Sequence, residues 1–132
     1  GASKGYEDAP KVILQGHMDM VGSKTENSDH DFTKDPIIPV IEGEYLSAKD
    51  TTLGADNGIA VAMGLALLED ENYQGPQIEL LVTTDEETSM SGAIALADDV
   101  LEGDYLINID SEEEGILTVG SAGGITFFVE EN

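Results

Sequence analysis

The stretch VILQGHMDMV, residues 12–21, decides how this chain is expected to fold. Its first three residues, Val12, Ile13 and Leu14, form a continuous apolar run, which is typical of a strand buried in a parallel sheet. Polar and charged side chains follow at once, so we predict a strand over residues 11–20 that ends in a loop. Because sites in open α/β sheets form at the carboxyl ends of strands, this loop is a candidate site.

Other apolar runs predict an alternation of strands and helices. Residues 37–41 and 45–48 flank a short loop containing glycine, which indicates a hairpin. A wide apolar stripe over residues 56–70 predicts a mostly buried helix. The remaining predictions are an interior strand at 78–82, a helix at 92–101, and strands at 105–109, 117–119 and 125–129. This order is typical of an α/β layered fold.

Composition narrows the class of protein. The 132 residues suit a single domain, and no apolar run is long enough to predict a membrane span. The absence of cysteine excludes disulfides and thiolate metal sites, and it fits a cytoplasmic protein. A net charge of −23 repels phosphate backbones, so nucleic acid is not an expected partner.

Four polar clusters lie where predicted strands end or a helix begins. They are His17 with Asp19, Asp56 with Asn57, Asp85 with Glu86 and Glu87, and Asp110 with Ser111. Three of them follow strands and are expected to meet at one edge of the sheet. A histidine among several carboxylates suits zinc, manganese or cobalt better than calcium.

His17, Asp19 and Asp56 each allow two interpretations. In an extended chain the side chains of His17 and Asp19 share a face, so Asp19 can hold one ring nitrogen and leave the other for a metal. The alternative is a core histidine satisfied by a carboxylate. Asp56 is either a helix cap or a carboxylate that bridges two metal ions.

Glu86 and Glu87 follow the strand at 78–82 after two threonines and Asp85. A multivalent cation would relieve the repulsion among these carboxylates. Neighbouring residues in extended chain point in different directions, so one glutamate can bind a metal while the other faces a water. The alternative is a solvated acidic turn.

Taken together, the motifs at residues 16–21, 52–58, 83–87 and 108–113 resemble those of the M20 family of metallopeptidases, and most of all its aminoacyl-histidine dipeptidase branch. The resemblance implies a three-layer α/β zinc-peptidase domain with a mostly parallel mixed sheet. It also implies two Zn²⁺ ions, with Mn²⁺ or Co²⁺ as alternatives, and hydrolysis of dipeptides that carry a C-terminal histidine.

The resemblance also implies a role for each site residue. His17 would bind one metal ion and be oriented by Asp19. Asp56 would bridge both ions, with a cis peptide bond to Asn57. Glu86 would be the general base. The remaining ligands would be Glu87 and Asp110.

Two departures from the family pattern bear on activity. Ser89 stands where the family usually has glycine. Family members are also longer, so we expect residues 1–132 to be part of a catalytic domain that lacks the lid or dimerisation domain and a last metal-binding histidine. We therefore expect this chain to be poorly active alone and the full-length parent to be a homodimer.

Other functions remain open at this point. The chain could belong to another M20-type peptidase or deacylase, or be a non-catalytic acidic module that binds a divalent cation or a partner. Glu86 favours catalysis, because a pure binding site needs no base beside its ligands. An acidic α/β domain with no site is the least specific alternative.

Overall fold

The central strand β1, Val12–His17, lies between two parallel neighbours in a three-stranded sheet. β4, Ile78–Thr83, pairs with all of β1, and β5, Tyr105–Asn108, pairs with its first four residues. This computed structural model describes residues 1–111, 113–121 and 123–124. The strand predicted at residues 11–20 is confirmed, but it ends at His17.

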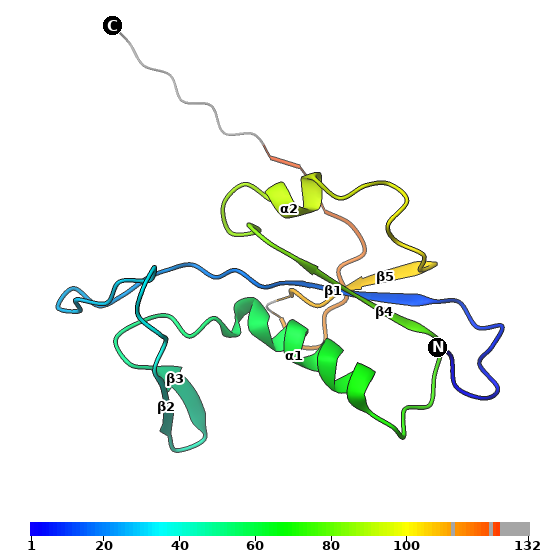
Figure 1. Cartoon of the computed structure of the whole chain (residues 1–132), viewed down its shortest axis with the longest axis horizontal. Helices are drawn as coiled ribbons and strands as arrows, with labels where there is room; N and C mark the ends of the chain where they lie inside the picture. Colours follow the sequence, from blue (N-terminus) through cyan, green and yellow to red (C-terminus); the bar gives the residue numbers. More distant parts are fainter. Residues whose placement is uncertain (112, 122, 125–132) are drawn as a thin grey trace, which may run out of the picture.

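Helices lie on both sides of this sheet (Figure 1). α1, Ala55–Glu69, contacts β1 and β4, and the short α2, Ser91–Ile94, lies on the opposite side. The predicted α/β fold with a mostly parallel sheet is therefore confirmed, and the described residues form parts of three layers.

The predicted hairpin is also confirmed. Its strands are β2, Pro39–Glu42, and β3, Tyr45–Ala48, which pair in antiparallel fashion away from the main sheet (Figure 1). Gly43 in the connecting turn has a φ of +65°, a value that glycine adopts without the steric cost of a Cβ.

α1 approaches β1 closely because small residues meet at the contact. A Cβ added to Gly16 of β1 would lie 2.6 Å from the Cβ of Ala60 on α1. Ala60 is buried, together with Ile13 and Leu14 of β1. Leu14 shares with Gly16 the face of β1 that meets α1, whereas Ile13 points to the opposite face and lies near Gly103, so the core of the described chain covers both faces of β1.

Two predictions about burial are wrong. α1 was expected to be mostly buried, yet only Asn57, Ala60 and Gly64 are buried in it. It contacts the sheet along one face, so apolar side chains elsewhere on it, such as Ile59, stay exposed. β4 was expected inside the sheet, but among the described residues it lies at an edge, because the strand order is β4-β1-β5.

Two predicted elements near the carboxyl end also differ. The helix predicted at 92–101 ends at Ile94; Asp98 and Asp99 would stand in its last turns, where negative charge opposes the helix dipole. Residues 117–119 form no strand, and Val119 is fully exposed without a partner strand among the described residues. The strand predicted at 125–129 lies outside the described residues.

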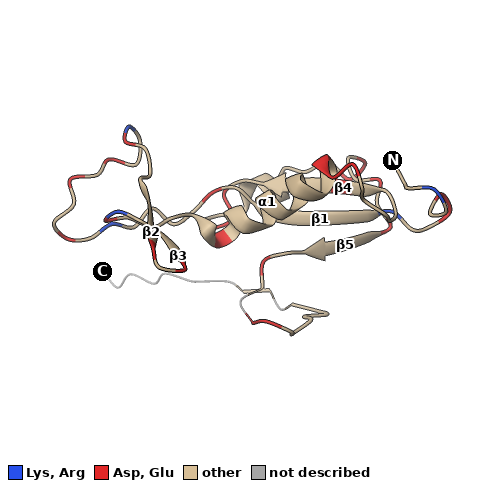
Figure 2. Ribbon diagram, turned by 90° about the horizontal axis from the view of Figure 1, so that it is seen from below, with Lys and Arg blue, Asp and Glu red and all other residues tan. Residues whose placement is uncertain are grey.

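The parallel pairing brings the ends of the three strands to one edge. His17 is in register with Thr83, and Gln15 is in register with Asn108. The residues that follow each strand therefore gather at the same place. Acidic side chains are spread over many loops and stand at both ends of α1 (Figure 2), so this gathering, rather than overall charge, defines the site. None of the described helices is long and apolar enough to cross a lipid bilayer.

Candidate metal centre

The candidate site is centred on the imidazole of His17, the last residue of β1, which is only 1% exposed. Its Nε2 lies 3.1 Å from Oδ1 of Asp56, 3.8 Å from Oε2 of Glu86 and 3.8 Å from Oδ2 of Asp110. These carboxylates come from α1, from the loop after β4 and from the loop after β5. The structure thus brings together clusters that lie far apart in the sequence.

Asp19 orients the ring of His17, although not through the atom that was expected. Nδ1 of His17 lies 3.0 Å from the backbone carbonyl oxygen of Asp19 and 3.4 Å from its carboxylate Oδ1. A carbonyl oxygen only accepts hydrogen bonds, so Nδ1 carries the proton. In the neutral ring Nε2 then has a free lone pair that points at the three carboxylates, as a metal ligand requires.

The surroundings of His17 favour positive charge. Burial lowers the pKa of His17, but the charge of Asp110, the hydrogen bond of Asp56 and the charge of Glu86 together outweigh burial and raise the pKa above 6.5. The negative charge of the same three carboxylates would stabilise any cation bound at Nε2.

Asp56 is not a helix cap. The cap position is Gly54, and no side chain caps the helix. Asp56 and Asn57 have non-helical backbone angles, and the peptide bond between them is cis, as the resemblance implied. The carboxylate of Asp56 is directed at His17 instead, so the capping interpretation is wrong.

Glu86 and Glu87 are tied to the strand ends by their backbone. The N–H group of Glu87 donates to Oδ2 of Asp19 at 3.2 Å. Burial raises the pKa of Asp19, but this hydrogen bond and one from the backbone of Glu86 outweigh it and hold the pKa below its usual range. Asp19 therefore stays ionised between the histidine and the two glutamates.

Asp85 turns away from the other carboxylates. It has a φ of 61° and accepts hydrogen bonds from the hydroxyls of Thr88, Ser89 and Ser91, which hold its pKa well below the usual range. The serine that replaces the family's usual glycine therefore has a bonding partner. The positive φ values in this turn fall on Asp85 and Met90, and Ser89 has none.

The donor atoms suit a metal ion of the zinc type. Among the described residues, one ligand atom each of His17, Asp56 and Asp110 lie within 4.8 Å of one another, as do those of His17, Glu86 and Glu87. A nitrogen donor with carboxylate oxygens favours zinc, manganese or cobalt over calcium. Glu87 thus groups with Glu86 rather than with Asp56, and the bridging role of Asp56 stays a prediction.

The carboxylate of Asp19 faces the other side of the His17 ring from the three carboxylates at Nε2. Its buried Oδ1 has no hydrogen-bond partner and lies 3.4 Å from Nδ1 of His17. Its negative charge therefore stabilises the proton on Nδ1 and leaves Nε2 as the nitrogen that can bind a metal.

Asn57 belongs to this site and was given no role from the sequence. Its side chain contacts both His17 and the segment that carries Asp110. Its only signal in the sequence is its position next to Asp56, which does not reveal these contacts.

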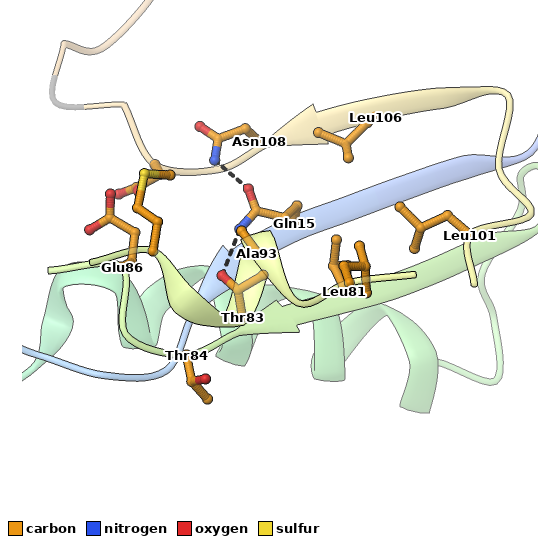
Figure 3. A pocket seen from close by; sticks show the side chains of 12 residues that line it. Gln15, Leu81, Thr83, Thr84, Glu86, Ala93, Leu101, Leu106 and Asn108 are labelled. Carbon is orange, nitrogen blue, oxygen red and sulfur yellow. Dashed lines mark hydrogen bonds between the residues drawn. The ribbon is translucent and has the colours of Figure 1, made fainter. Parts of the chain in front are cut away.

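A cavity of about 240 Å³ lies beside Glu86, on the side of the sheet that faces α2 (Figure 3). Gln15 spans its floor, donating to Oγ1 of Thr83 and accepting from Nδ2 of Asn108. Much of its remaining wall is apolar and includes Leu81, Leu101 and Leu106. An apolar wall next to a carboxylate reduces the access of water to that carboxylate on this side.

Comparisons with known proteins identify the family of this chain. The sequence profile of Peptidase family M20/M25/M40 matches residues 13–126. Cytosol non-specific dipeptidase of Escherichia coli (strain K12) is 52% identical over 126 residues, which make up 96% of this chain and 26% of that protein. Uncharacterized protein YqjE of Bacillus subtilis (strain 168) is 28% identical over 113 residues, or 83% of this chain and 28% of that protein.

A solved structure gives the same result. The crystal structure of aminoacylhistidine dipeptidase from Vibrio alginolyticus matches with a TM-score of 0.81 and 53% identity, over 86% of this chain and 23% of that one. The chain spans about a quarter of the length of these relatives. Since the profile covers most of the chain and the fold agrees, this chain belongs to peptidase family M20/M25/M40.

Proposed function

We propose that the protein hydrolyses dipeptides in a metal-dependent reaction, with Xaa-His dipeptides among its substrates. The observation that carries the proposal is the meeting of a buried imidazole with carboxylates from three separate segments, one of which belongs to Glu86. The names of the relatives support the substrate class, because one is a non-specific dipeptidase and another an aminoacylhistidine dipeptidase.

The proposed cofactor is a pair of Zn²⁺ ions, for which Mn²⁺ or Co²⁺ could substitute. His17, Asp56 and Asp110 would hold one ion, and Glu87 would bind the second, with Asp56 shared between them. When bound, such ions polarise a scissile carbonyl and lower the pKa of a nearby water. The close approach of one donor atom each from His17, Asp56 and Asp110 supports the first ion site. Glu87 lies close to it, because one of its donor atoms groups with those of His17 and Glu86.

Glu86 is the proposed general base. Its carboxylate faces the imidazole at 3.8 Å and is about one-third exposed, so it remains open to a water and a substrate. It would take a proton from the attacking water and deliver it to the leaving amine as the peptide bond breaks. Asp19 would act beside it by keeping Nε2 of His17 free of a proton.

The setting of the reaction is part of the proposal. The name of the Escherichia coli relative supports a cytoplasmic location, and its length supports a longer parent protein in which further segments complete the site. We propose a small peptide as the substrate partner and a homodimer as the assembly of the full-length parent. Nucleic acid and membranes are not proposed partners.

Glu86→Gln tests the catalytic role in the complete protein. We expect turnover of an Xaa-His dipeptide to fall about 10²- to 10⁴-fold, the usual contribution of a general base, while bound zinc is retained. Glu42→Gln, which removes an exposed carboxylate on the distant hairpin, is the matched control and should leave turnover unchanged.

Two results would contradict the proposal. Unchanged turnover in Glu86→Gln would exclude Glu86 as the base. Zinc binding without any peptide hydrolysis by the unmodified protein would favour the non-catalytic cation-binding module instead. A panel of dipeptides and acylated amino acids would separate a dipeptidase from a deacylase of the same family.

A further inference from the structure

Asn57 is a buried polar residue at the start of α1 whose side-chain amide makes three hydrogen bonds. It is 4% exposed. Its Oδ1 accepts a hydrogen bond from the backbone N–H of His17 at 3.2 Å. Its Nδ2 donates to the backbone carbonyl of Ile109 at 2.7 Å and to Oδ1 of Asp110 at 3.1 Å.

These three hydrogen bonds join three segments that carry candidate metal ligands. The acceptor reaches β1 at His17, the donors reach the chain after β5 at Asp110, and the backbone of Asn57 is bonded directly to Asp56. No other described side chain bonds to both His17 and Asp110 within the site.

The bond to Asp110 selects one orientation of that carboxylate. Oδ1 of Asp110 accepts from Asn57, and the other oxygen, Oδ2, lies 3.8 Å from Nε2 of His17. A carboxylate held in this way is already oriented with one oxygen toward a metal ion before the ion binds. An amide is suited to this position because it both accepts and donates, whereas a carboxylate only accepts.

β1 leaves room for the amide at Gly16. A Cβ built on Gly16 would lie 2.3 Å from Oδ1 of Asn57, far inside ordinary contact distance. Gly16 has no positive φ, so its lack of a side chain serves this close approach and not a turn.

We propose that Asn57 is a positioning residue that aligns His17, Asp56 and Asp110 for metal binding, an inference that rests on the proposed metal-dependent function. Asn57 does not bind the metal or the substrate. It acts through the ligands, and its loss should therefore change the affinity and geometry of the metal site in a protein that is still folded.

The experiment compares Asn57→Ala and Asn57→Asp with the unmodified complete protein by zinc titration calorimetry. Removing a residue that orients a metal ligand typically lowers affinity about 10- to 100-fold, and we expect a loss of this size in both variants. Asn57→Asp keeps the acceptor for His17 but loses both donors. Its added charge alone would tighten cation binding, so a loss of affinity reports on positioning.

A second readout separates positioning from mere stability. The absorption spectrum of the Co²⁺-loaded protein reports ligand geometry, and we expect it to change in each variant that circular dichroism shows to be folded. Asn72→Asp adds the same charge at an exposed position beyond the far end of α1 and should leave affinity and spectrum unchanged.

Each outcome decides the proposal. If Asn57→Ala does not fold, the isosteric Asn57→Asp variant decides alone. Zinc affinity and a Co²⁺ spectrum equal to those of the unmodified protein, or tighter zinc binding by Asn57→Asp, would overturn the positioning role and leave the proposed function standing. Failure of the unmodified protein to bind zinc would overturn both.

Discussion

Replacing Gly16 by alanine tests the packing on which the site depends. The added Cβ would lie 2.3 Å from Oδ1 of Asn57 and 2.6 Å from the Cβ of Ala60, where ordinary contacts begin at 3.4 Å. Both neighbours are buried, so α1 must shift away from β1 by about 1 Å to make room. The hydrogen bond from His17 to Asn57 would lengthen or break with that shift.

The expected magnitude follows from three contributions. Overpacking of this kind costs about 1–3 kcal/mol. Loss of the hydrogen bond costs about 1 kcal/mol more. Replacing glycine reduces the conformational entropy of the unfolded chain, which offsets about 0.4–1 kcal/mol. We therefore expect Gly16→Ala to lower the free energy of unfolding by about 2 kcal/mol.

Urea unfolding followed by circular dichroism measures this difference. Gly58→Ala is the matched control, because a Cβ on this exposed residue of α1 meets nothing within 4 Å. It should stabilise the protein by about 0.5–1 kcal/mol through helix propensity. If Gly16→Ala were as stable as the unmodified protein, α1 would not pack on β1 as closely as described. That result would also contradict the hydrogen bond between Asn57 and His17 and the positioning role proposed for Asn57.

Three further predictions concern metal, pH and the core. Zinc at about 100 times its dissociation constant should stabilise the protein by about 2.7 kcal/mol, so a chelator should lower the melting temperature in calorimetry, and an unchanged melting temperature would argue against a bound ion. Hydrogen bonds from the ammonium of Lys34 and from the hydroxyl and backbone of Thr33 lower the pKa of Asp31 from 3.8 to about 2. Its contribution to stability is therefore present above pH 3.8 and lost as the pH falls toward 2, and Lys34→Met should raise the titration midpoint of Asp31 measured by NMR. Leu14→Ala, in the buried core, should cost about 2–5 kcal/mol in urea unfolding, whereas Leu117→Ala, at an exposed position, should change stability by less than about 0.5 kcal/mol; equal effects would contradict the described burial.

Much of the site could be predicted because its residues follow strands. An apolar run such as residues 12–14 indicates a strand, and the polar residues after it lie at the carboxyl end by necessity. Parallel pairing then brings His17 together with Glu86 and Asp110. The direction of pairing follows from the alternation of strands and helices, which is visible in the sequence. The predicted site residues thus met where expected.

The sequence alone therefore determined the α/β class, the strand ends and the set of polar groups that lie at them. These features follow from the local pattern of apolar and polar residues along the chain. Only the tertiary structure decided which partners those groups have. Asn57 bonds to residues 40 and 53 positions away in sequence, and the ring of His17 is held by a backbone carbonyl rather than by the expected carboxylate. Burial also depended on the tertiary structure. The apolar pattern of α1 indicates which of its side chains could be buried. Contact with a single face of the sheet determines which of them are buried.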